Sequence, residues 1–193
     1  MPTIKKLLLL SGFASALLFN SITSVYANIQ STTETLSAGY SVLKLLLEDE
    51  QYLTTIRRTR LIITFTDISD DSITLIDEIS ESSEQSLDEL ENLTEEKPDI
   101  IYLDFSNDTI ASATLNSLRM RTAKEFIFDG ENFEKNLLLS QLKVLPVIFH
   151  LAEELEKKET NENRKRWLKK LADHYEKHYL KINDRILIVS KDN

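Results

Sequence analysis

The sequence predicts an all-α fold, an antiparallel bundle of four to five helices. Residues 28–193 contain two glycines and two prolines, too few for the frequent turns of a β-sandwich or barrel. Apolar residues recur every three to four positions over most of this range, which is the period of an amphipathic helix. The chain has no cysteine, which excludes thiol catalysis and thiolate metal sites.

Residues 1–27 have the features of a signal peptide. Two lysines precede the apolar stretch 7–19, and Val25-Tyr26-Ala27 presents small residues at the positions that signal peptidase reads. The apolar stretch is too short to span a bilayer as a stable helix. We therefore expect cleavage near Ala27 and a single helical domain over 28–193 without a transmembrane segment. The mature chain is then periplasmic or secreted; an uncleaved membrane anchor is the alternative.

Two long helices are expected in the first half of this domain. The first begins at the capping-box pattern Ser31–Glu34 and continues to about Arg60. The second starts after a polar cap near residues 66–69, carries acidic residues in its first turn, and ends near Thr94. Its middle, 81–86, is polar all round, so this stretch faces solvent or pairs with other polar groups. Residues 95–99 break the pattern and contain a proline.

The second half continues in the same way. A third helix is expected over about 106–126, ending before Asp129-Gly130. Residues 133–158 form the most regular helical pattern of the chain, and the pattern resumes at 164 and continues to about 182. The polar spacer between these last two helices is short, which predicts an antiparallel hairpin.

Three apolar runs rich in β-branched residues leave a second fold open. They lie at 61–65, 100–105 and 186–189. If all three are strands, the fold is α+β with a small sheet from residues near 62, 102 and 187. If they are helix ends and extended linkers, the fold is the helical bundle, which the helical spacing elsewhere favours.

Charge is distributed unevenly along the chain. The net charge is −9, which argues against nucleic acid as a partner. Residues 67–99 contain thirteen acidic residues and one lysine, whereas residues 157–185 contain ten basic and five acidic residues. The acidic and basic helices therefore either lie side by side, or each meets a partner of opposite charge.

The three histidines of the chain all fall in the C-terminal hairpin. His174 and His178 are four residues apart and share a helix face, and the expected turn brings His150 to about the same level as His174. Imidazoles and carboxylates on facing helices can hold iron, manganese or zinc. The candidate metal ligands are His150, Glu154, His174 and His178; the alternative is that they are ordinary surface and core-edge residues.

The C-terminal part also resembles a known family. Its motifs are Glu131–Lys135, Ser140-Gln141-Leu142 and Leu151–Leu155, continuing to His178. They resemble the last two helices of a bacterial family of exported, ferritin-like four-helix proteins of unknown function. The resemblance covers about a third of the chain and implies an exported helical bundle.

No catalytic triad, phosphate-binding loop, dinucleotide fingerprint or HExxH motif occurs in the sequence. We therefore expect an exported helical binding or interaction protein without enzymatic activity or cofactor, with a protein partner in the cell envelope. The alternative function is that of a ferritin-like metal-binding protein, with an iron, manganese or zinc ion held by the histidine and carboxylate cluster of the hairpin.

Overall fold

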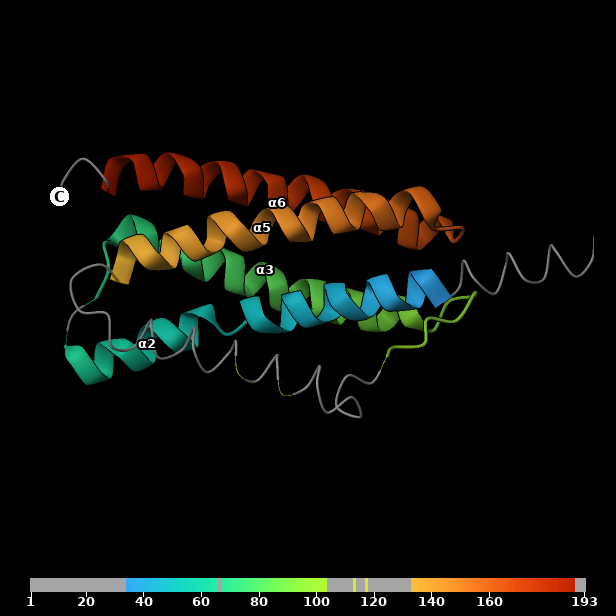
Figure 1. Ribbon diagram of the computed structural model, residues 1–193, viewed down its shortest axis with the longest axis horizontal. Coiled ribbons are helices and arrows are strands. Elements are labelled where there is room, and N and C mark those ends of the chain that lie inside the picture. Colours follow the sequence, from blue (N-terminus) through green and yellow to red (C-terminus); the bar gives the residue numbers. More distant parts are fainter. Residues whose placement is uncertain (1–33, 66, 104–112, 114–116, 118–132, 190–193) are drawn as a thin grey trace, which may run out of the picture.

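The computed structural model describes residues 34–65, 67–103, 113, 117 and 133–189, and within these residues all regular structure is helical (Figure 1). A first helical segment covers 34–50. It is followed by α2 (Leu53–Thr64), α3 (Asp70–Thr94), α5 (Phe133–Lys158) and α6 (Glu162–Val189). The predicted all-α bundle is confirmed.

The helices lie along one another in the long direction of the molecule (Figure 1). The segment 34–50 and α2 run toward one end, and α3 returns from that end to the other. Helices α5 and α6 form the predicted antiparallel hairpin, and α6 also packs against α3. In the described part of the chain, no helix is both long and apolar enough to cross a membrane.

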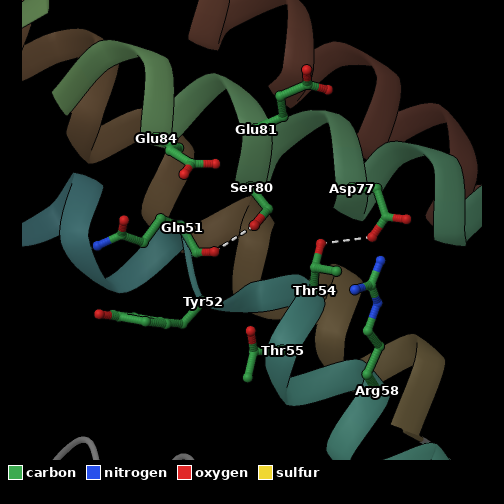
Figure 2. A pocket seen from close by; sticks show the side chains of 9 residues that line it. All are labelled: Gln51, Tyr52, Thr54, Thr55, Arg58, Asp77, Ser80, Glu81 and Glu84. Carbon is green, nitrogen blue, oxygen red and sulfur yellow. Dashed lines mark hydrogen bonds between the residues drawn. The ribbon is translucent and has the colours of Figure 1, made fainter. Parts of the chain in front are cut away.

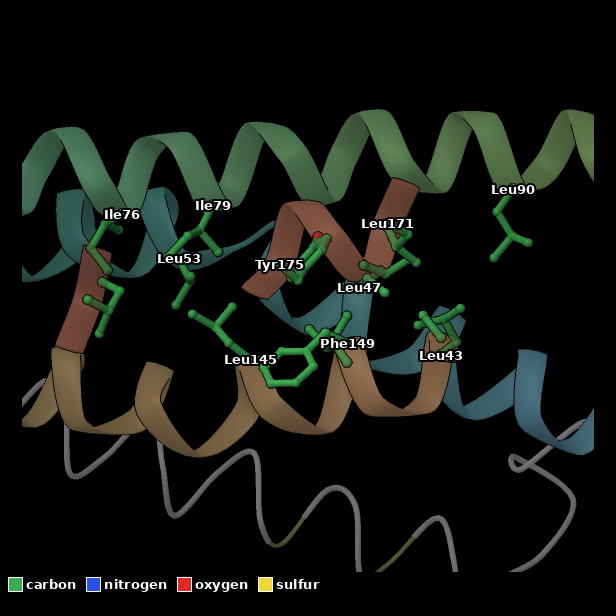
Figure 3. Packing of buried hydrophobic residues seen from close by; sticks show 14 of the residues in the cluster. Leu43, Leu47, Leu53, Ile76, Ile79, Leu90, Leu145, Phe149, Leu171 and Tyr175 are labelled. Carbon is green, nitrogen blue, oxygen red and sulfur yellow. The ribbon is translucent and has the colours of Figure 1, made fainter. Parts of the chain in front are cut away.

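A core of buried aliphatic and aromatic side chains fills the space between these helices (Figure 3). Leu43 and Leu47 reach it from the segment 34–50, and Leu145 reaches it from α5. Each such leucine is fully buried and stabilises the fold by about 1.5–3 kcal/mol. Gly39 lets the segment 34–50 approach α5 closely, since a Cβ there would lie 2.5 Å from Leu155 Cδ2.

The three apolar runs are not strands, so the α+β alternative is wrong for the described residues. Residues 61–64 complete α2, and 186–189 complete α6. Residues 100–103 form neither helix nor strand; the N–H groups of Ile101 and Leu103 donate to the hydroxyls of Ser37 and Ser41, at 3.3 and 2.8 Å. Helical periodicity outweighs β-propensity in the two runs that continue a long helix.

The first long helix differs from the prediction. It does not run on to Arg60 but is interrupted at Gln51 and Tyr52, and α2 begins at Leu53. The expected ends of the next two described helices agree closely, since α3 ends at Thr94 and α5 covers 133–158, but α6 continues to Val189, about two turns beyond the expected end near 182. The signal peptide 1–27, the start of the capping box at 31–33 and most of the third helix expected at 106–126 lie outside the described residues.

The acidic helix α3 and the basic helix α6 lie side by side, as one of the two charge interpretations predicts. Lys181 Nζ contacts Glu78 Oε2 at 2.6 Å, and Arg185 Nη1 contacts Asp71 Oδ2 at 3.2 Å. The polar middle of α3 is also paired with α6: Ser83 Oγ and Tyr175 Oη lie 2.7 Å apart in the core.

The turn between α5 and α6 contains a buried ion pair. Glu159 accepts hydrogen bonds from Arg164 Nε and Nη2 at 2.9 and 3.2 Å, and both side chains are almost fully excluded from solvent. Tyr40 Oη donates to the same carboxylate at 2.6 Å. Burial raises the pKa of Glu159, but the bonds from Arg164, Tyr40 and the backbone outweigh it, so the pKa is below its usual value.

The same cluster fixes the C-terminal end of α3. Arg164 Nη1 donates to the carbonyl of Glu96 at 2.8 Å, and Asn161 Nδ2 donates to Glu96 Oε2 and to the Lys97 carbonyl, both at 2.9 Å. The Asn161 side chain also caps α6, because its Oδ1 accepts the N–H of Asn163 at 2.9 Å. The hairpin turn, the segment 34–50 and the end of α3 therefore meet around one buried charge pair.

We expect Arg164→Met to lower the free energy of unfolding by about 3–5 kcal/mol, because it leaves the Glu159 carboxylate buried without its counter-ion. Urea unfolding followed by circular dichroism measures this. The matched control is Lys169→Met, an exposed position on the same helix, where a change within about 0.5 kcal/mol is expected. Equal effects of the two substitutions would show that the buried pair is not a major determinant of stability.

Candidate functional site

The interruption of the first helix opens a groove against α3 (Figure 2). The cavity measures about 410 Å³ and is open to solvent. One side comes from the interruption and the first turns of α2, and the other from α3. The lining residues are Gln51, Tyr52, Thr54, Thr55, Arg58, Asp77, Ser80, Glu81 and Glu84.

The backbone at the interruption is held by polar contacts with α3. Gln51 N–H still bonds to the Leu47 carbonyl at 3.0 Å, whereas Tyr52 N–H turns to the Asp49 carbonyl at 3.3 Å. The Gln51 carbonyl accepts the hydroxyl of Ser80, as Figure 2 shows. Ser80 therefore occupies one of the acceptors that the end of the first helix leaves free.

The groove is predominantly acidic. Asp77 accepts a hydrogen bond from Thr54 Oγ1 at 2.6 Å and lies 3.7 Å from Arg57 Nη2, although Asp67 holds the same guanidinium more closely, at 2.7 Å. Glu81 and Glu84 are exposed and form no ion pair with the described residues. Tyr52 lines the opposite side of the groove and is 56% exposed. The groove lining thus combines two carboxylates without an ion pair and an aromatic ring with one guanidinium, Arg58, and this excess of negative charge suits a cationic ligand.

A carboxyl group lies buried directly behind the interruption. Burial raises the pKa of Glu50 to about 8, and the nearby charge of Asp49 acts in the same direction. A hydrogen bond with the side chain of Gln141 on α5 lowers the pKa of Glu50, but by less than burial raises it. Glu50 Oε2 has no hydrogen-bond partner among the described residues. Near neutral pH, Glu50 is therefore mostly protonated.

Two of the predicted metal ligands come together. The Nε2 atoms of His174 and His178 lie 2.8 Å apart on α6, and Ser82 Oγ of α3 lies 3.0 and 3.1 Å from them. Burial lowers the pKa of His178 to about 4, helped by the neighbouring His174 and Lys181. Burial also lowers the pKa of His174, with Lys177 and Lys181 acting in the same direction.

The other two predicted ligands lie apart from this pair. His150 is exposed on α5, and its Nδ1 lies 2.9 Å from Glu153 Oε2 on the same helix. Glu154 is exposed and accepts a hydrogen bond from Lys157 Nζ at 2.6 Å, which lowers the pKa of the carboxyl. Within the described residues no three histidine, aspartate or glutamate side chains converge as a metal centre, so the predicted four-ligand set is not assembled.

Three residues of these sites were not singled out from the sequence. Ser82 has no distinguishing signal beyond the polar stretch 81–86 that contains it. Glu50 resembles any carboxylate near a helix end, and its burial depends on contacts with α5 and α6. Tyr52 marks the interruption, but no glycine or proline announces a break at that point.

Comparison of the chain with protein-family models, with curated proteins and with solved structures finds no match. The geometry of the described residues alone defines the class of protein: an all-α bundle with an acidic surface groove on one side of α3 and a histidine pair where α3 contacts α6.

The raised pKa of Glu50 predicts a pH-dependent stability. Between the usual carboxyl pKa of 4.5 and about 8, the unfolded chain releases a proton that the folded chain retains. This contribution makes the fold less stable as pH rises through that window. We expect Glu50→Gln to be roughly 2–4 kcal/mol more stable relative to the native sequence at pH 8.5 than at pH 5.

Urea unfolding of both proteins at pH 5, 6.5 and 8.5 measures this difference. A suitable control is Glu48→Gln, which removes a partly exposed carboxylate from the same helix. Parallel stability curves for the native protein and Glu50→Gln would contradict the assignment of a protonated Glu50.

Proposed function

We propose that this protein is an exported, non-catalytic helical binding module of the cell envelope, and that its acidic groove receives a basic segment of a protein partner. The single observation that carries the proposal is that the groove lining holds two exposed carboxylates, Glu81 and Glu84, with no ion pair among the described residues, together with the exposed ring of Tyr52 (Figure 2). Export is supported by the signal-peptide pattern of residues 1–27.

The chemistry of the groove selects the kind of ligand. Glu81 and Glu84 lie about one turn apart on α3, so two basic side chains of one segment can reach them. The exposed ring of Tyr52 can stack on a guanidinium group. Elsewhere on α3, Glu78 and Asp71 already pair with Lys181 and Arg185 of α6, whereas Glu81 and Glu84 form no ion pair with the described residues.

An arginine–glycine decapeptide carrying a fluorescent label serves as the probe, with binding measured by anisotropy at low and at physiological salt. We expect Glu81→Gln/Glu84→Gln to weaken binding about five- to tenfold, because each exposed ion pair contributes a few tenths to about 1 kcal/mol. Tyr52→Ala is expected to weaken binding further through the lost cation–π contact.

The matched control is Asp173→Asn/Glu176→Gln, which removes two exposed carboxylates from α6 and so changes the net charge equally. This control should leave peptide affinity nearly unchanged. Equal weakening by both double substitutions would mean that the peptide responds to overall charge, and the groove would not be the binding site.

A further inference from the structure

Three electron-pair donors converge where α3 meets α6. They are Nε2 of His174, Nε2 of His178 and Oγ of Ser82, separated by 2.8, 3.0 and 3.1 Å. The two imidazoles come from consecutive turns of α6, and the hydroxyl comes from a helix about ninety residues earlier in the chain. The triangle is thus created by the packing of the two helices.

Hydrogen bonding satisfies this triangle only where the Ser82 hydroxyl turns from the Glu78 carbonyl to an imidazole, since the donor and acceptor roles of the three contacts depend on the histidine tautomers. When Ser82 Oγ donates to the Glu78 carbonyl, at 2.6 Å, the hydroxyl hydrogen is directed away from both rings. Only one of the two Nε2 atoms can carry a hydrogen toward the other. The imidazole without that hydrogen then faces Ser82 Oγ with no proton between them, so at least one short contact joins two lone pairs.

The three separations are compatible with ligands at right angles around one metal ion. Two ligands at right angles around an ion, each about 2.0–2.2 Å from it, lie about 2.8–3.1 Å apart. The three distances at this site fall in that range. Paired imidazoles favour zinc, copper, nickel or iron over magnesium or calcium, which prefer oxygen ligands.

The two histidines differ in their surroundings: His178 is buried and held in place, whereas His174 lies on the side of the site that solvent can reach. His178 is 4% exposed and its ring lies edge-on to Tyr175, with 5.9 Å between ring centroids. His174 is exposed and borders a surface cavity of about 180 Å³ between α3 and α6. Water can therefore reach the open positions of an ion. Glu78, one turn before Ser82, adds a carboxylate nearby, bound to Lys181.

We propose that His174, His178 and Ser82 form one face of a binding site for a single divalent transition-metal ion. The inference is independent of the groove, which lies at the interruption of the first helix. It also differs from the four-ligand set expected from the sequence, because His150 and Glu154 take no part and a serine from α3 does.

The test is isothermal titration of the full chain with nickel chloride and with zinc chloride after treatment with a chelator, and native mass spectrometry gives the stoichiometry. We expect one ion per chain. His174→Gln should weaken binding at least tenfold, equivalent to about 1.4 kcal/mol. Ser82→Ala should weaken it less, since a hydroxyl is a weaker ligand than an imidazole.

His150→Gln is the matched control, because it removes the remaining histidine of the chain and should leave affinity unchanged. His178 is buried, so His178→Gln is interpreted only where its circular dichroism spectrum is native; His174→Gln, at an exposed position, carries the test otherwise. Failure of the native protein to bind either ion, or equal binding by His174→Gln, would overturn the proposal.

Discussion

The buried pair of Glu159 and Arg164 determines how the helices are placed relative to one another. Two charges removed from water are tolerated only where every polar atom is matched. Here the guanidinium also reaches the carbonyl of Glu96, and the carboxylate also accepts Tyr40. A slip of α3 by one residue would move its side chains by about 1.5 Å along the axis and rotate them by roughly 100°. Such a slip would separate Arg164 Nη1 from the Glu96 carbonyl and remove this buried hydrogen bond, although the Glu159–Arg164 pair itself lies within the hairpin turn.

The position of the histidine pair follows from that register. Helices α3 and α6 are antiparallel, and Ser82 precedes Glu96 by as many residues as His178 follows Arg164. Because both helices rise by about 1.5 Å per residue, Ser82 and His178 lie at the same height along the helix pair, about 21 Å from the contact between Arg164 and Glu96. Serines along α3 allow close packing there: Ser80 contacts the interruption of the first helix, whereas Ser82 contacts α6. One helix therefore contributes to both candidate sites, on different sides.

The candidate sites were only partly predictable. Spacing by four residues places His174 and His178 on one face of α6, and the structure brings them together. Counting residues from the hairpin turn also placed His150 at the same height along the hairpin as His174. The count does not specify on which side of α5 the His150 side chain lies. His150 lies on the exposed side of α5 and contacts Glu153. The groove could not be predicted, because its interruption at Gln51 and Tyr52 lacks a helix-breaking residue.

The sequence by itself determined the helical class, the bounds of α3 and α5, and the hairpin, because apolar periodicity and short polar spacers act locally. It also determined that an acidic and a basic helix could complement each other. Only the tertiary structure decided that Glu50 is buried, that Glu81 and Glu84 remain uncompensated, and that a serine joins two histidines. Each of these depends on which residues meet across helices, and those contacts depend on the rotation and register set by packing and by the buried ion pair.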